Sequence, residues 1–287
     1  MRTSNFKYVL LLPTLLILVV TTVLPILQVV NLSFQRWQIT RSLTPQGYVG
    51  FDNYVRAFQD GDFLNSLRVT FTYTTMTAFF SIVVGVFIAV NVQRGSIFAD
   101  IVKALLIFPF AISLTLRGYS YRFMLLEGQG IIDTMLDFLF PFMQNVVWLA
   151  NPFWALFWMS AALFWAWGPL GGLMILGALN NIDSGIFEAA KVDGASDWRV
   201  FVNITLPLLR PMILVVALLI TLFSSRMFDL VLTMTAGGPG RATETLNYFI
   251  YRVGFQIFDM GYASALAMIL TMILIVLSYV YSRVLLD

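Results

Sequence analysis

Long apolar runs recur along the chain, and each is long enough to cross a bilayer. About 20 apolar residues in a helix span the ~30 Å hydrocarbon core. Of the 287 residues, 59% are hydrophobic and 11% are charged, which is more apolar surface than a soluble domain of this size can bury. We therefore expect an all-α, polytopic membrane protein forming one domain over residues 1–287. Its six predicted transmembrane helices lie near residues 8–33, 69–92, 104–125, 152–179, 211–235 and 261–283.

Basic residues set the expected orientation, because cytoplasmic loops carry an excess of Lys and Arg. If the N-terminus is inside, the inner segments hold eight basic residues and the longer outer loops hold six. The inner set is Arg2, Lys7, Arg94, Lys103, Lys191, Arg199, Arg210 and Arg283, and the outer set is Arg36, Arg41, Arg56, Arg68, Arg241 and Arg252. This bias places both termini in the cytoplasm.

Several chemistries are excluded by residue types that the sequence lacks. The chain contains no cysteine and no histidine, so disulfides, thiol nucleophiles, haem ligation and ordinary zinc sites are not expected. The glycine-rich stretch 235–245 is not followed by the Gly-Lys-Ser or Gly-Lys-Thr of a phosphate-binding loop. Asp133 and Asp137 lie four residues apart, and we expect them on the solvated face of a short helix rather than in an acid/base pair. The sequence therefore predicts no catalytic residue, no metal site and no cofactor held by this chain.

A polar loop at residues 180–210 separates two of the apolar runs. Apolar residues recur every fourth position from Asn180 to Ala190, which predicts a short amphipathic helix with Asp183 as its cap. Gly194 ends this helix, because glycine adopts the left-handed conformation that a tight turn requires. A second helix starts near Trp198, and Pro207 marks the return to the membrane. The loop is therefore predicted to be a helix, a glycine turn and a second helix at the membrane surface.

The same loop carries a spaced pattern: Glu-Ala-Ala, three residues, Gly, nine residues, Ile, one residue, Leu-Pro. This pattern resembles the signature loop of the membrane subunits of binding-protein-dependent ABC importers; the alternative is an ordinary loop with an Asp-Gly-Ala turn. The resemblance implies that the loop is cytoplasmic and docks into a groove of an ATP-hydrolysing subunit. The coupling residues that it implies are Glu188, Ala189, Ala190, Asp193, Gly194, Ala195, Ile204, Leu206 and Pro207.

Further segments resemble the sugar-importing branch of this family, related to the maltose and glycerol-phosphate transporters. They are residues 50–54, 228–229, 235–245, 251–252 and 259–265. The resemblance implies a carbohydrate or a related solute, carried through a path formed with a second permease subunit. It also implies a bacterial or archaeal inner membrane, surrounding lipid and no nucleic acid. The other implied partners are two ATP-binding subunits, which hold ATP and magnesium, and an extracytoplasmic solute-binding protein; the second permease is expected to differ from this one.

Residues for the solute path follow from polar and aromatic side chains inside the predicted spans. Trp154, Trp158 and Trp165 form an aromatic stripe, which is either a wall for stacking sugars or a packing surface. Arg226 and Asp229 are three residues apart and can meet as an ion pair on a helix, beside Ser225. Arg117 lies deep in the third span, and Arg122 can reach the outer surface. The candidates for the path are Arg117, Trp158, Trp165, Ser225, Arg226 and Asp229.

Two alternatives remain open from the sequence. The solute is either a neutral sugar, with the arginines engaged inside the protein, or an anionic saccharide that these arginines bind. The alternative function is a secondary transporter driven by an ion gradient, which would need proton-relaying carboxylates or histidines in the membrane. Asp229 is the one deep carboxylate in the predicted spans.

Overall fold

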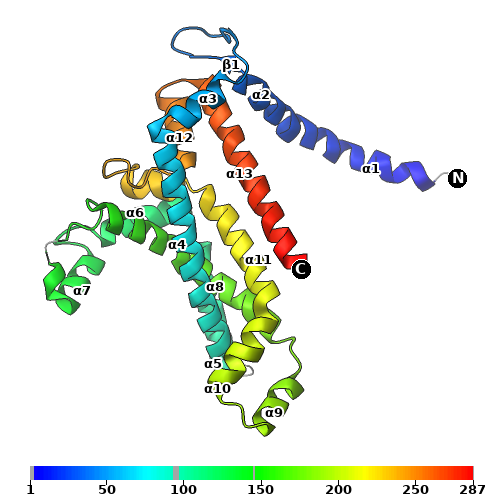
Figure 1. Cartoon of the computed structure of the whole chain (residues 1–287), viewed down its shortest axis with the longest axis vertical. Helices are drawn as coiled ribbons and strands as arrows, with labels where there is room; N and C mark the ends of the chain where they lie inside the picture. Colours follow the sequence, from blue (N-terminus) through cyan, green and yellow to red (C-terminus); the bar gives the residue numbers. More distant parts are fainter. Residues whose placement is uncertain (1–2, 93–96, 145, 287) are drawn as a thin grey trace. The chain divides into compact units, whose positions relative to one another are not determined.

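The computed structural model describes residues 3–92, 97–144 and 146–286, and the structural statements below concern those residues. Most described segments are helical (Figure 1). The chain divides into two compact units, one of residues 1–64 with 249–273 and one of residues 65–248 with 274–287. Three charges used for the expected orientation lie outside the described structure: Arg2, Arg94 and the side chain of Lys7.

The first unit contains a long helical arm, a small β ribbon and the helices that follow it. In the ribbon, two strands pair antiparallel with Gln35 opposite Tyr48 and Arg36 opposite Gly47. The elements are α1 (Thr3–Leu18), η1 (Val19–Val23), α2 (Leu24–Ser33), β1 (Gln35–Arg36), β2 (Gly47–Tyr48), α3 (Asp52–Gln59), the start of α4 (Gly61–Asn91), the end of α12 (Leu246–Tyr251), η5 (Arg252–Gln256) and the start of α13 (Met260–Leu286).

The second unit is a helical bundle around α8, the most buried of the long helices. Of the apolar window of α8, 56% is buried. The elements are the remainder of α4, α5 (Ile97–Ala111), α6 (Leu114–Met124), α7 (Ile131–Leu139), η2 (Pro141–Met143), α8 (Pro152–Leu179), α9 (Ser184–Val192), α10 (Asp197–Val200), η3 (Phe201–Thr205), α11 (Leu206–Ser225), η4 (Val231–Thr235), the start of α12 and the end of α13.

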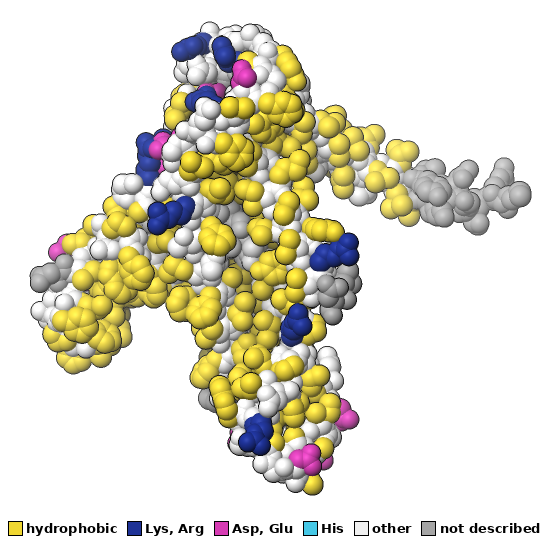
Figure 2. Space-filling view, viewed as in Figure 1, with side chains coloured by type: hydrophobic (Ala, Val, Ile, Leu, Met, Phe, Trp, Pro, Cys, Tyr) yellow, Lys and Arg dark blue, Asp and Glu magenta, His cyan; other side chains and the backbone are white. Residues whose placement is uncertain are grey.

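The described residues include five helices that are long and apolar enough to cross a membrane. They are Leu10–Ser33, Gly61–Asn91, Pro152–Leu179, Asp197–Ser225 and Met260–Leu285. The bent pair α5–α6 brings the number to six when it is counted as one span. Hydrophobic side chains cover much of the visible surface (Figure 2), as lipid-exposed helices require. The expectation of an all-α, polytopic membrane protein is confirmed.

Glycines allow α4 and α8 to approach closely. A Cβ atom on Gly85 would lie 3.1 Å from the backbone nitrogen of Gly172 and 3.2 Å from the carbonyl oxygen of Gly168. Small residues at such contacts let membrane helices pack backbone against backbone. Helix α8 continues through Gly168 and Pro169 to Leu179. The glycines there serve helix packing.

The third predicted span, 104–125, is not one helix. It consists of α5 and α6, which meet at an angle of 94°. The break lies at Ile112 and Ser113, shortly after Pro109. Ser113 is extended, and its hydroxyl accepts from the Leu116 backbone N–H at 3.3 Å, which caps α6. A new cap therefore starts a second helix in a new direction.

The fifth predicted span, 211–235, is displaced along the chain. The helix runs from Asp197 to Ser225, and the segment Val231–Thr235 forms the separate turn η4. The π-helical turn η3 shifts the hydrogen-bond register just before Pro207, since the Leu206 N–H bonds to the Phe201 carbonyl. The helix thus passes through a proline that the sequence suggests as its boundary.

The prediction that Asp133 and Asp137 both face solvent is wrong for Asp133. Asp133, at the start of α7, is 3% exposed. Its carboxylate accepts from the Trp148 indole N–H at 2.7 Å and from the Gly128 backbone N–H at 2.7 Å. Asp133 therefore fastens the connection between α6 and α8.

Candidate functional site

The first arm of the 180–210 loop is α9, which begins four residues later than the sequence suggests. Asp183 caps the helix, as predicted, because its carboxylate accepts from the Gly185 backbone N–H at 3.0 Å. The helix ends at Val192, two residues beyond the predicted end. Asn180 therefore belongs to the preceding turn.

Gly194 forms the turn with a pair of hydrogen bonds typical of a Schellman motif. Its N–H bonds to the Lys191 carbonyl at 3.0 Å, and the Ala195 N–H bonds to the Ala190 carbonyl at 3.0 Å. Gly194 has φ +72°, in the left-handed region, and no atom lies within 4 Å of where its Cβ would be. The requirement for glycine here is therefore conformational, not steric.

Exposed apolar side chains cover this loop. Val192 is 87% exposed, and Trp198, which packs beside Phe201 with ring centroids 5.7 Å apart, is 73% exposed. The Glu188 carboxylate is exposed, and no interaction with another described residue engages it. Large apolar groups in water beside a free carboxylate are typical of a surface that a partner protein covers.

The other coupling candidates differ in burial. Ala190 is buried, Ala195 and Ile204 are half-buried, and Ala189, Asp193, Leu206 and Pro207 are exposed. All of them belong to α9, the Gly194 turn or the start of the Asp197–Ser225 helix. The structure therefore brings the signature residues together on one helix–turn–helix.

Arg117 lies inside the corner between α5 and α6. It is 3% exposed, and its Nη2 donates to the Pro109 carbonyl at 2.6 Å and to the Ile112 carbonyl at 3.0 Å. Pro109 lies in the last turn of α5 and Ile112 in the break that follows, where carbonyls lose their helical partners. Arg117 therefore fixes the corner with its charge directed at backbone oxygens.

The predicted ion pair between Arg226 and Asp229 is wrong. In the described structure, Arg226 Nε donates to the Leu222 carbonyl at 3.2 Å, and Asp229 Oδ1 accepts from the Thr115 hydroxyl at 3.5 Å. α11 ends at Ser225, so the three-residue spacing no longer places these two side chains on one helical face. Ser225 is buried, and its hydroxyl bonds to the Thr221 carbonyl at 2.7 Å.

The tryptophans of the predicted stripe have separate surroundings. Trp158 packs edge-on against Trp148, with ring centroids 6.0 Å apart, in an aromatic cluster that includes Trp154. Trp165 is 40% exposed and lies 6.2 Å from the ring of Tyr121. Trp158 is therefore a packing residue in this unit, whereas Trp165 stays accessible.

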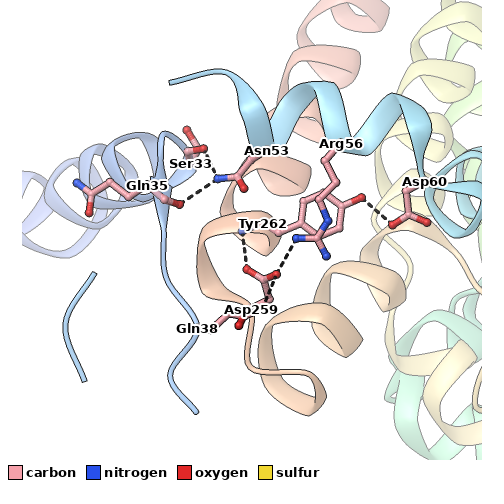
Figure 3. A network of polar contacts seen from close by, with 8 residues as sticks. All are labelled: Ser33, Gln35, Gln38, Asn53, Arg56, Asp60, Asp259 and Tyr262. Atoms are coloured by element: carbon pink, nitrogen blue, oxygen red, sulfur yellow. Dashed lines mark hydrogen bonds and ion pairs between the residues drawn. The ribbon is translucent and has the colours of Figure 1, made fainter. Parts of the chain in front are cut away.

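A polar network in the first unit was missed from the sequence (Figure 3). Arg56 Nη1 lies 2.8 Å from Asp259 Oδ2, and the guanidinium sits 3.9 Å over the ring centroid of Tyr262. The Tyr262 hydroxyl donates to Asp60 Oδ2 at 2.8 Å. Asp259 is 4% exposed, so Arg56 compensates a buried carboxylate.

Asn53 adds a second connection in the same unit. Its amide nitrogen donates to the carbonyls of Ser33 at 2.9 Å and Gln35 at 3.0 Å. Both Asn53 and Asp259 belong to the segments that resemble sugar importers. That resemblance is the one sequence signal that marks these residues, although it gives no hint of their contacts.

No group of three or more metal-ligating side chains comes together within the described ranges. The described geometry instead consists of membrane helices, a broken span and an exposed loop with a glycine turn. These features define a polytopic membrane protein with an exposed loop that a partner protein can cover.

Comparisons with known proteins agree with this class. Residues 81–287 match the family described as "Binding-protein-dependent transport system inner membrane component". The chain is 30% identical over 275 residues to the sulfoquinovosyl glycerol transport system permease protein SmoG of Agrobacterium fabrum, covering 96% of this chain and 88% of that protein. It is 27% identical over 283 residues to the trehalose/maltose transport system permease protein MalF of Thermococcus litoralis, covering 99% and 94%.

A solved structure shares the fold. The bacterial alginate ABC transporter in complex with an alginate pentasaccharide-bound periplasmic protein has a chain that superposes with a TM-score of 0.81 at 21% identity, covering 97% of this chain and 93% of that one. The fold and the comparisons thus define a transmembrane permease of the ABC-importer class. The chain belongs to the family of inner membrane components of binding-protein-dependent transport systems. It is a transport subunit, and ATP hydrolysis resides on a separate subunit in this family.

Proposed function

We propose that the chain forms half of the translocation path for a carbohydrate or related solute in an ATP-driven importer. The observation that carries this proposal is the exposed helix–turn–helix of residues 184–207, with its Schellman turn at Gly194 and its uncovered Val192 and Trp198. A surface of this kind suits a groove on an ATPase subunit. Binding of ATP to the ATPase subunit would move the docked loop. Helix α11, which follows the loop, would carry this motion into the membrane.

The proposed assembly contains two permease subunits, two ATP-binding subunits and an extracytoplasmic solute-binding protein. The second permease is proposed to be a related but different chain. ATP and magnesium belong to the ATPase subunits, and this chain holds no cofactor. Both termini and the coupling loop face the cytoplasm in this arrangement.

The coupling role is assigned to the signature residues Glu188, Ala189, Ala190, Asp193, Gly194, Ala195, Ile204, Leu206 and Pro207. Glu188 supplies a free carboxylate for a basic group of the ATPase, and Gly194 supplies the turn. For the solute path, Trp165, Arg226 and Asp229 remain candidates because they are at least partly accessible. Arg117, Trp158 and Ser225 are proposed to support that path from within the protein.

The carbohydrate class is supported by the relatives, whose names include a sulfoquinovosyl glycerol transport system and a trehalose/maltose transport system. One of these solutes is anionic and the other is neutral. The relatives therefore support sugars as a class, and they leave the charge of the solute to be found from the site.

The decisive experiment is uptake by proteoliposomes that contain the complete complex. We expect uptake that requires ATP and stops when the ATPase subunit carries an inactivating substitution in its phosphate-binding lysine. A complex assembled with an unmodified ATPase serves as the control. If uptake persists with the inactive ATPase and follows an imposed ion gradient, the chain is a secondary transporter and the proposal fails.

A further inference from the structure

Helix α6 presents an aromatic face that is not packed against its own unit. Tyr119 and Phe123 lie four residues apart, so their rings share one side of the helix. They are 57% and 69% exposed, whereas Arg117, Gly118 and Tyr121 on the opposite side are buried. The exposed side is therefore open to lipid, to another subunit or to a ligand.

A cavity of about 770 Å³ opens on this face. It is lined by Tyr119, Ser120, Arg122, Phe123, Met124 and Leu126. Ligand sites for small molecules typically measure ~300–1,000 Å³ and combine apolar walls with a few polar groups. Two aromatic rings, two hydroxyls and one guanidinium fit that description. Aromatic rings also suit the apolar faces of sugars.

Arg122 is the cation of this cavity. Its side chain is exposed, and no hydrogen bond or ion pair with another described residue engages it. It also borders a second cavity of about 440 Å³, whose lining includes Glu127, Thr235 and Pro239. Glu127 is the carboxylate among these lining residues, so the second cavity carries both charges, whereas Arg122 is the one charged residue among the described residues that line the first cavity.

The surroundings argue for an aqueous or ligand-filled face. Arg122 lies in the last turn of α6, and charged side chains near the ends of membrane helices extend to water, so the guanidinium side of this face is aqueous or ligand-filled. Guanidinium binds carboxylate, phosphate and sulfonate oxygens through paired hydrogen bonds. Arg117, by contrast, already directs its charge at the carbonyls of Pro109 and Ile112.

We infer that Tyr119, Arg122 and Phe123 form a binding site for a saccharide that carries an anionic group. The sugar ring stacks on Tyr119 and Phe123, and the oxyanion pairs with Arg122. The inference rests on the proposed function, because it names the charge of the solute that passes along this path.

The experiment uses the absence of native cysteine in the chain. Ser120→Cys places one thiol on the exposed side of the cavity, and its alkylation by a water-soluble maleimide is measured in the complete complex in nanodiscs. Digalacturonate serves as the anionic probe and maltose as the neutral one. We expect digalacturonate to slow alkylation and maltose to have a much weaker effect. The ratio of rates with and without sugar removes any effect of substitutions on thiol reactivity.

Three variants test the role of the charge. With Ser120→Cys, Arg122→Gln should raise the digalacturonate concentration for half-protection about 10- to 100-fold, the loss expected for a charged hydrogen-bonded pair. Arg122→Lys should recover part of the protection, because the charge remains without the planar fork. Arg41→Gln, at an exposed arginine in the 37–46 loop, is the matched control and should leave protection unchanged.

Several results would overturn the inference. The first is a thiol that maleimide does not reach, which would mean that lipid or the second permease covers the face. The others are equal protection by both sugars and unaltered protection in Arg122→Gln. ATP hydrolysis stimulated by the solute-binding protein is measured in the same preparations. Its presence with failed protection rejects this site alone, whereas its absence rejects the proposed function and this inference with it.

Discussion

Gly194 shows how one residue can determine a surface. Its φ of +72° places it in the left-handed region, which costs ~1–2 kcal/mol for a residue with a β-carbon. The space around it is open, so side-chain size is not the constraint. The backbone there reverses direction and sets the relation between α9 and the helix that begins at Asp197.

Gly194→Val should therefore impair coupling while leaving membrane insertion intact. A β-branched residue disfavours the left-handed conformation, so the two hydrogen bonds of the turn weaken and the loop changes shape. Gly194→Asn is the matched control, because asparagine tolerates this conformation. We expect uptake and solute-stimulated ATP hydrolysis to fall at least tenfold in the valine variant and to be largely retained in the asparagine variant. Normal uptake with valine would refute the coupling role.

A substitution of Glu188 tests whether charge contributes to docking of the 184–207 loop. Its carboxylate is exposed and unpaired among the described residues, so Glu188→Gln removes a charge without removing an internal contact. If the carboxylate meets a basic group of the ATPase, affinity between the subunits should fall severalfold at low ionic strength and less in high salt. The measurement is co-purification of the ATPase subunit across a salt series. Identical retention of the wild type and the variant would mean that Glu188 only solvates the loop.

At the scale of elements, the corner between α5 and α6 depends on Arg117. Its guanidinium occupies the carbonyls that the break at Ile112 leaves free, and Ser113 caps the next helix. Arg117→Gln should lower the free energy of unfolding by ~2–3 kcal/mol, because two charged hydrogen bonds are lost inside the protein. Thermal stability of the purified subunit in detergent measures this loss, and the exposed Arg41→Gln variant is the control. Stability equal to the control would show that the corner holds without Arg117.

The sequence predicts elements well where the apolar signal is long. The runs that contain α4, α8 and α13 are far longer than a chance cluster, so their existence follows from hydropathy alone. Breaks are harder to predict, since the corner at Ser113 depends on a cap and on an arginine whose target is the backbone. The residues after the break are more polar than those before it, but this change in polarity does not determine the direction in which the next helix runs.

Predictions of contacts between side chains fail for a related reason. The spacing of Arg226 and Asp229 predicts an ion pair only if one helix carries both, and α11 ends at Ser225. The contact of Arg56 with Asp259 joins positions more than 200 residues apart, which no local spacing reveals. The loop around Gly194 was predictable because each of its signals is local: a cap, a glycine and a following helix.

At the scale of the whole molecule, the orientation remains a prediction that labelling can test. Ser196→Cys is suited to the inner side, because Ser196 is exposed and its side chain makes no capping bond. Thr44→Cys is suited to the outer side because Thr44 is exposed, whereas Asn53 is buried and would not react. In intact cells an impermeant maleimide should modify only the cysteine at 44, and permeabilised cells should allow both. Labelling at 196 in intact cells would reverse the topology.

The helix Leu10–Ser33 has a consequence for how the protein is made. None of its apolar window is buried against the rest of the chain, and Leu10, Ile17 and Leu27 are all more than half exposed. Its stability as a helix therefore comes from lipid and from its own backbone bonds, so it can insert as a complete unit while later segments are still being synthesised. Helix α8 has 56% of its apolar window buried, so its packing is complete only once neighbours such as α11 have been synthesised. Synthesis thus proceeds from the helix Leu10–Ser33, which the bilayer alone can accept, to α8, which packs against other helices of the chain.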